Sequence, residues 1–532
     1  MRTWGFLVVA IATSAVMLGC GNKGFSERTK ASATVTAFRY PVVTSPTTLD
    51  PHKVEDGDTI DVLQQTFEGL VAWGEDSRVK PMLADWKVED GGRSYLFTLK
   101  PGIKFQNGRA VTADDVKWSY ERATNPKLAS PVAATYLSDI VGLQAKLEGK
   151  AKEVEGITVV SPNQIRITTD QPRPYFLGKL TYLVGAVMAK ESAPADSEIT
   201  KAEQMVGTGP FRTTRYEPDL LVVQEAFADY HGGKPAVAQI QRPVIKDAAT
   251  RLNKYKAGQL DLVMLERQDI AGLQKDPEYA SQLKFFDRPS IWYVGLAPNA
   301  YPPFRDPRVR RAFAMAIDKK TLVDEILGGV NHVANGILPP GVEGARPSAK
   351  FIPYDPEGAQ KLLAEAGFPG GKGLPPLEFN FRERRDVQLV ADAVAGQLKA
   401  NLGVSTNLRM MEWGAYLEKR NRGQLQLFHM RWAADYLDPE NFLSLMLSTK
   451  GPENKMGYSN PEFDRLCREA DTMPNGEARM AKYAQAEDLV LQDAPWVPIY
   501  FQRDAELIRP NVKGLRESLF GHLPHLTVQV SP

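Results

Sequence analysis

The sequence has only two cysteines, Cys20 and Cys467, in 532 residues. Cys20 ends the N-terminal apolar segment described below, where its sulfur is expected to be modified. Only Cys467 is then left, so no intramolecular disulfide is expected. Stability must therefore come from packing. Cys467 lies on the apolar stripe of a helix that begins at Asn460-Pro461, and we expect a buried structural thiol rather than a reactive one.

The chain also lacks an excess of either charge. Lysine and arginine total 65 and aspartate and glutamate 64, which gives a net charge of +1. Such a balance produces no field that would gather nucleic acid, and we expect no nucleic-acid partner. After the N-terminus no run approaches the ~18 apolar residues of a membrane-spanning helix. The length exceeds what one core usually supports, so two or three lobes are expected.

Catalytic signatures are absent as well. The sequence contains no Gly-x-Ser-x-Gly, His-Glu-x-x-His, Cys-x-x-Cys or phosphate-binding loop motif. Gly207 and Gly209 lack the third glycine of a dinucleotide loop, because Arg212 occupies its place. His522 and His525 form the only close histidine pair, and the turn character of their segment favours a surface loop over metal ligands. We therefore expect no enzyme, cofactor or metal site; paired carboxylates leave an exported hydrolase as a distant alternative.

What is present begins at the N-terminus. Arg2 precedes an apolar stretch from residue 5 to residue 18, and Gly19 stands directly before Cys20. The arrangement resembles a bacterial lipoprotein signal, although Met17 departs from the usual aliphatic residue. The resemblance implies cleavage after residue 19, lipidation of Cys20, a flexible tether over residues 20–34 and a place in the cell envelope, on the periplasmic or extracytoplasmic face of a membrane. An ordinary signal peptide with a chance cysteine is the alternative.

Strand and helix patterns are intermixed in the rest of the chain. Residues 95–99 alternate as a half-buried strand, and residues 157–159 and 165–167 flank a turn as a hairpin. Helices are predicted to begin at Thr112, at Asp306-Pro307 and at Asp355-Pro356, where a capping side chain precedes an apolar periodic segment. The mixture indicates an α/β protein with more than one lobe.

Eight segments occur together in a characteristic order. They are LDPH at 49–52, TFEGLV at 66–71, LKPGIKF at 99–105 with NG at 107–108, TADDV at 112–116, GTGPF at 207–211, PFRDPRVR at 303–310, WAADYLDP at 432–439 and YSNPEFD at 458–464. In this the chain resembles the oligopeptide-binding branch of the extracellular solute-binding proteins, family 5, which serve ABC importers.

The resemblance implies a periplasmic-binding-protein-like fold of type II, cluster C, with two lobes around a cleft that closes by a hinge motion. The main domain of lobe I is expected at residues 35–60, 180–288 and 505–532, and an inserted domain at 61–179. Lobe II is expected at 289–504, with crossings near Pro289 and Arg503. A monomer is expected.

Asp435 is the principal site residue that the resemblance implies. It is expected just past a strand over residues 424–431, and in peptide-binding relatives the acid at this place pairs with the ligand's α-ammonium. A cation enclosed away from water requires such a partner. The alternative is that Asp435 only caps the turn at residues 436–439.

The resemblance also assigns further ligand contacts. Backbone edges are expected at Thr44, Ser45 and Pro46 on one lobe and at Arg431, Trp432 and Ala433 on the other. Trp413 and Trp432 are expected to line side-chain pockets, with a core position as the alternative for Trp413, and Tyr293 is expected among the peptide-binding residues. Arg420 matches an arginine that meets a peptide carboxylate, unless it is a solvated charge. His429 replaces an arginine of some relatives, which leaves recognition of the carboxylate open.

The expected function is that of a lipid-anchored receptor that binds short peptides and delivers them to an ABC permease without catalysis. The same fold in relatives carries nickel chelates, oligosaccharides, haem, antimicrobial peptides or opines, so a non-peptide solute is the nearest alternative.

Overall fold

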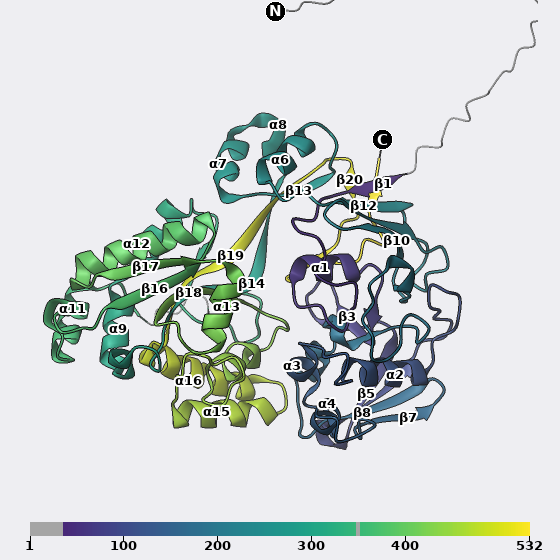
Figure 1. The fold of residues 1–532 in the computed structure, drawn as a ribbon, viewed down its shortest axis with the longest axis horizontal. Coiled ribbons are helices and arrows are strands. Elements are labelled where there is room, and N and C mark those ends of the chain that lie inside the picture. The colour runs from purple at the N-terminus through teal and green to yellow at the C-terminus, as the bar shows by residue number, and fades with distance from the viewer. Residues whose placement is uncertain (1–35, 347–351, 532) are drawn as a thin grey trace, which may run out of the picture. The chain divides into compact units, whose positions relative to one another are not determined.

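The computed structural model describes residues 36–346 and 352–531 (Figure 1). The predicted signal peptide, Cys20 and the tether lie outside the described residues. Within these two ranges, no helix combines the length and the hydropathy needed to cross a bilayer.

The largest sheet of the described chain has seven strands. Its order is β13-β19-β14-β18-β16-β17, and β15 pairs with β19. The strands are β13 (Leu262–Met264), β14 (Leu283–Leu296), β15 (His332–Val333), β16 (Leu377–Arg382), β17 (Thr406–Met411), β18 (Leu427–Ala433) and β19 (Trp496–Ile508). β16 runs parallel to both β17 and β18, and the other pairs are antiparallel. Figure 1 shows β14 and β19 side by side over their length.

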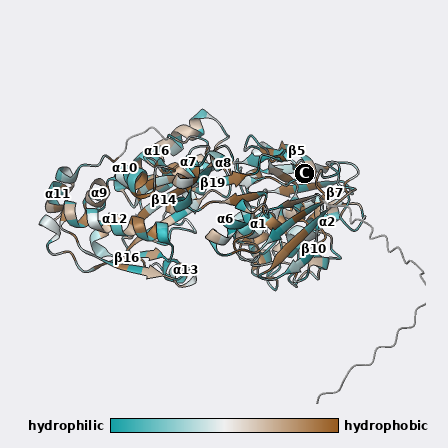
Figure 2. Cartoon of the chain, turned by 90° about the horizontal axis from the view of Figure 1, so that it is seen from above, coloured by the Kyte–Doolittle hydropathy of each residue, from teal (hydrophilic) through white to brown (hydrophobic). Residues whose placement is uncertain are grey.

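Helices cover both faces of this sheet. One core joins the sheet to α9 (Pro307–Met315), α11 (Pro356–Glu365) and α12 (Arg385–Leu402). The opposite core contains residues of α13 (Trp413–Asn421), α14 (Ser444–Leu447), α15 (Pro461–Thr472) and α16 (Glu477–Asp493). The sheet is therefore the middle layer of three, as its apolar side chains on both faces require. Strands carry much of the hydrophobic colour in Figure 2.

Two four-stranded sheets come mainly from the first half of the chain. One has the order β1-β12-β11-β10, from β1 (Ala37–Arg39), β10 (Phe211–Glu217), β11 (Leu221–Ala226) and β12 (Gln239–Pro243). The other has the order β5-β6-β8-β7, from β5 (Ala84–Glu89), β6 (Ser94–Leu99), β7 (Ile157–Ser161) and β8 (Gln164–Thr168). The predicted strand over 95–99 and the hairpin of β7 and β8 are confirmed.

Shorter elements complete the described chain. The helices are α1 (Gly57–Leu63), α2 (Ala113–Ala123), α3 (Ala133–Leu137), α4 (Leu143–Leu147), α5 (Phe176–Lys179), α6 (Ala248–Lys256), α7 (Arg267–Lys275), α8 (Pro277–Ala280) and α10 (Lys319–Thr321). The strands are β2 (Glu68–Gly69), β3 (Val71–Trp73), β4 (Val79–Pro81), β9 (Ala186–Val187), β20 (Val512–Lys513), β21 (Glu517–Ser518), β22 (Gly521–His522) and β23 (Gln529–Val530).

The predicted helix starts are confirmed, and each has a local cause. Thr112 caps α2 and forms a capping box with Asp115. Asp306 and Asp355 accept hydrogen bonds from first-turn amides of α9 and α11, and proline occupies the first turn of each helix. Asn460 caps α15 in the same way. Cys467 lies on the buried side of α15 with 1% exposure, as expected.

β14 and β19 pass through both predicted crossing points. Their antiparallel register is interrupted between Asp287 and Ile291, a stretch that includes Pro289. Proline cannot donate a ladder hydrogen bond, which accounts for a break at this place. We retain the domain boundaries given above as a proposal, with the interruption as the point where lobe I gives way to lobe II.

The LDPH segment is fixed by a buried ion pair. Arg122 of α2 pairs with Asp50, and both side chains are fully buried. The guanidinium also donates to His52 Nδ1 at 2.9 Å and to the Ser197 carbonyl at 2.6 Å. These contacts keep the pKa of Asp50 below its usual value although burial opposes this, while burial lowers the pKa of His52 to about 4. Arg122 therefore neutralises the one carboxylate of this cluster, and His52 is uncharged.

Candidate ligand-binding site

Asp435 lies two residues beyond the end of β18, where it was expected. On one side β18 pairs with β14 along its whole length, from Leu427 to Ala433. On the other side β16 pairs only with Leu427 and Phe428. In the part of the chain that the structure describes, residues 429–433 thus have no strand on that side, which leaves a short backbone edge leading to Asp435.

The Asp435 carboxyl group meets side chains from the first half of the chain. Tyr136 of α3 hydrogen-bonds to it, and Tyr182 is close enough to interact electrostatically. The two phenol rings stack with centroids 3.9 Å apart. Burial raises the pKa of Asp435 to about 6, and hydrogen bonds from Asn441 and Tyr136 and the more distant Arg431 only partly oppose this. Asp435 is therefore a partly buried carboxylate that has no close cation among the described residues.

Asn441 fixes the segment around Asp435. Its side-chain oxygen accepts a hydrogen bond from the Asp435 backbone amide at 3.2 Å and from Trp432 Nε1 at 3.1 Å. Trp432 Nε1 also donates to the Asn441 carbonyl at 3.0 Å. The indole of Trp432 is half-buried and packs against the core beneath α13 to α16. These bonds hold Trp432 and Asp435 in one fixed arrangement.

Arg420 and Tyr293 belong to the packed interior of the same lobe. Arg420 Nη2 pairs with Glu453 Oε2 at 2.9 Å, and Tyr293 stacks on Trp496 with centroids 3.7 Å apart. Both line a cavity of only about 10 Å³. A space of that size holds about one water molecule, and Arg420 already has a carboxylate partner.

His429 and Trp413 both lie near Arg382. His429 is buried, stacks on Trp292 with centroids 5.2 Å apart, and has a pKa lowered by burial to about 3. It is therefore neutral at physiological pH. Trp413 begins α13, is 40% exposed and lies 5.1 Å from the Arg382 guanidinium.

Thr44, Ser45 and Pro46 follow β1 in lobe I. Thr44 is exposed and Pro46 is buried. Ser45 Oγ accepts from the Asp219 amide at 2.6 Å, and the Pro46 carbonyl accepts from Tyr216 Oη at 3.3 Å. The structure thus anchors the segment at both residues and leaves Thr44 open.

A cavity with a volume of about 1000 Å³ does not include these predicted residues. Its walls come from β3, β4, α5, the start of β14 and the residues after Asp435. Aromatic side chains and carboxylates both line it, but Asp438 pairs with Arg479, Asp287 with Arg503, Glu517 with His522 and Asp76 with Lys80. Most of its negative charge is therefore already neutralised.

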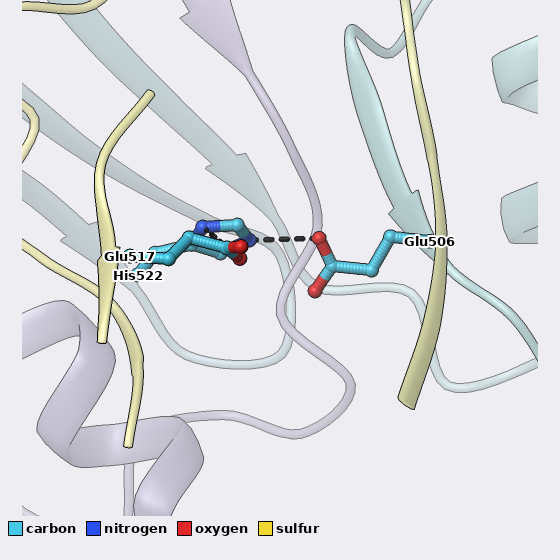
Figure 3. Close-up of side chains that lie close together, drawn as sticks. All are labelled: Glu506, Glu517 and His522. Atoms are coloured by element: carbon cyan, nitrogen blue, oxygen red, sulfur yellow. Dashed lines mark hydrogen bonds and ion pairs between the residues drawn. The ribbon is translucent and has the colours of Figure 1, made fainter. Parts of the chain in front are cut away.

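The prediction that His522 and His525 lie in a surface loop is wrong. His525 is buried and its Nε2 lies 2.6 Å from Tyr40 Oη, while His522 lies between Glu506 at 2.8 Å and Glu517 at 3.0 Å (Figure 3). Local turn character gave no sign of these distant partners. The glutamates raise the pKa of His522 to about 10, so both ring nitrogens carry protons. The charged imidazole lies between two carboxylates, and the cluster forms an ion triad in this structure.

Sequence reasoning missed Tyr136, Tyr182 and Asn441 around Asp435, and Arg382 and Arg384 near His429. Asn441 could have been predicted from the sequence, because it closely follows the WAADYLDP segment at residues 432–439. The other four lie outside every motif, and only the three-dimensional fold brings them to the site.

The protein is a two-lobed binding protein of the periplasmic type. The features that indicate this class are the topology of the seven-stranded sheet, the long paired strands β14 and β19, and the partly buried carboxylate of Asp435. The model of the bacterial extracellular solute-binding proteins, family 5 (middle region), matches residues 78–454. The chain belongs to this family.

Characterised relatives span nearly the whole chain. It is 30% identical over 494 residues to the probable deoxycholate-binding periplasmic protein YgiS of Escherichia coli, with 90% of each chain covered. It is 30% identical to heme-binding protein A of Haemophilus influenzae, with 98% of each covered, and 30% identical to the periplasmic murein peptide-binding protein MppA of Escherichia coli, with 91% of each covered. The solved structure of the last protein superposes with a TM-score of 0.81 at 27% identity, covering 94% of this chain and 99% of that one.

Proposed function

We propose that this chain is a lipid-anchored extracytoplasmic receptor that captures short peptides with a free amino terminus and delivers them to an ABC importer. Asp435 pairs with the ligand's α-ammonium group, the backbone edge of β18 pairs with the peptide main chain, and the lobes close over the complex. Cys20 carries the lipid. The protein binds its solute without transforming it.

The observation that carries this proposal is the state of Asp435. Its carboxyl group is partly buried, interacts with phenols from the first half of the chain and has no close cation in the part of the chain that the structure describes. A ligand ammonium supplies the missing charge, and it binds strongly because water competes poorly there.

The same observation favours a peptide over the solutes named for two relatives. Neither haem nor deoxycholate has an ammonium group, so neither would neutralise Asp435. A peptide or another amino-bearing solute does so. The murein peptide-binding protein and the oligopeptide-binding proteins among the relatives are named for such ligands.

Mass spectrometry of the gently purified protein tests the proposal. We expect bound species whose masses and fragments identify peptides of a few residues with an unmodified amino terminus. Recovery of haem or a bile acid in their place would refute the peptide assignment. Recovery of cleaved products after incubation with an intact peptide would instead indicate a hydrolase.

Binding of a peptide recovered in this way should depend on pH through Asp435. The carboxyl group titrates near pH 6 without ligand, whereas the ammonium of the bound peptide holds it ionised. Affinity is therefore highest near pH 7, where Asp435 is ionised and most of the peptide amine is still protonated, and falls toward tenfold per pH unit below pH 6. Calorimetry between about pH 4.5 and pH 7, below the ordinary α-amine pKa of about 7.7–8.0, measures this. An Asp435→Asn variant should bind weakly with a flat profile; a wild-type profile equally flat contradicts the role of Asp435.

A further inference from the structure

Three arginines gather where β16 ends. Arg382 is the last residue of β16, Arg384 is the N-cap residue of α12, and Arg431 lies on β18. Arg382 lies 5.5 Å from the Trp292 ring and 5.1 Å from the Trp413 ring, and Arg384 lies 5.6 Å from Trp292. Tryptophan faces thus hold two guanidinium groups of like charge close together.

The positive charge of this arginine cluster is not balanced. Asp386 is its nearby carboxylate, and it is shared by Arg384 at 2.6 Å and by Arg267 at 3.4 Å. Arg431 donates to the neutral Gln502 side chain at 3.3 Å, and Asp504 is engaged by Arg288 at 2.6 Å. Among the described residues, neither Arg382 nor Arg431 forms an ion pair. Burial and the other two arginines lower the pKa of Arg382 to about 10.

Two further features favour an anion at the same place. The Arg382 Nε atom is buried without a partner, and so are both ring nitrogens of His429, which packs against Trp292 beneath the cluster. α12 runs for 18 residues and its N-cap residue makes no side-chain cap, although Asp386 Oδ1 accepts from the Val387 amide at 2.9 Å, so the positive dipole end of the helix also lies beside the arginines. Buried polar groups normally have partners, and unpaired donors beside excess positive charge suit a ligand oxygen.

We propose that Arg382, Arg384 and Arg431 form a subsite for a carboxylate of the bound ligand. This deepens the proposed function and rests on it. The subsite stands beside the unpaired edge of β18, so a peptide bound along that edge passes it. Arg420, which was expected to meet the carboxylate, is already paired with Glu453, and His429 is uncharged. The arginine cluster supplies the positive charge for a ligand carboxylate that Arg420 and His429 do not supply.

Two sources of the carboxylate are distinguishable: the peptide's C-terminus and an acidic side chain. The probes are two pools of random peptides of two to eight residues, one with free C-termini and one C-terminally amidated. Each is incubated with the full mature chain, and retained peptides are identified by mass spectrometry after size exclusion. We expect the free-acid pool to be retained at least about tenfold better, or the amidated pool to be enriched in aspartate and glutamate.

Arg382→Gln should abolish that preference while ammonium recognition at Asp435 persists. The matched control is Arg385→Gln, an exposed arginine in the first turn of the same helix, which should keep the preference. If Arg382 only packs between tryptophans, its replacement lowers thermal stability and leaves the preference intact. The subsite is refuted by that result, or by wild-type protein that retains both pools equally without acidic enrichment. Retention of neither pool refutes the peptide function itself.

Discussion

Asp435→Ala is expected to weaken the binding of a free-amine peptide by roughly 3–5 kcal/mol, about two to three and a half decades in Kd. The ligand ammonium would then be enclosed beside Tyr136 and Tyr182 with no opposite charge. Isothermal titration calorimetry with a peptide recovered from the protein measures the loss. The N-acetylated form of that peptide should bind wild type and variant with similar, weak affinity, because it has no ammonium to lose.

Two further variants separate the effect of the Asp435 charge on affinity from the effect of its packing. Asp435→Asn keeps the size of the side chain and should lose nearly as much affinity as Asp435→Ala. Asp392→Ala removes an exposed carboxylate from α12 in the same lobe and should leave affinity unchanged. An acetylated peptide that binds wild type as tightly as the free one would show that Asp435 does not recognise the amine.

The second large effect concerns stability. Arg122→Met should lower the free energy of unfolding by about 3–5 kcal/mol, since it leaves the buried Asp50 carboxylate without its cation. The Ser197 carbonyl and His52 lose a donor as well. The change appears as a lower urea midpoint in circular dichroism.

A double-mutant cycle identifies the cause. Adding Asp50→Leu to Arg122→Met removes the orphaned charge and should restore much of the loss. Arg93→Met breaks an exposed pair with Asp90, 3.8 Å apart, and should cost no more than about 0.5 kcal/mol. A loss as small for Arg122→Met as for Arg93→Met would mean that the pair is solvated in solution.

Local features of the fold were predictable because their causes are local. The caps at Thr112, Asp306, Asp355 and Asn460 act within one helical turn, and the hairpin of β7 and β8 needs only alternation around a short turn. The position of Asp435 beyond a strand also followed from sequence, although β18 begins three residues later than expected, at Leu427.

The surroundings of the site were not predictable, because they depend on contacts between distant segments. Tyr136 and Asp435 are separated by about three hundred residues, and no pattern near either one indicates the other. His522 shows the same limit. Its charge and burial depend on Glu506 and Glu517, whereas the turn character of its own segment predicted a side chain exposed to solvent.

The interruption of the ladder at Pro289 has a mechanical consequence. The β14–β19 ladder is already broken there, so bending at residues 287–291 costs few hydrogen bonds between these two strands. The contacts that resist bending are the pairing of Ser290 and Ile291 with β18 and the hydrogen bond from the Ala434 amide to the Pro289 carbonyl at 2.8 Å. In the proposed mode of action, a ligand that neutralises Asp435 beside Tyr136 and Tyr182 favours the closed arrangement, and its release allows the lobes to separate.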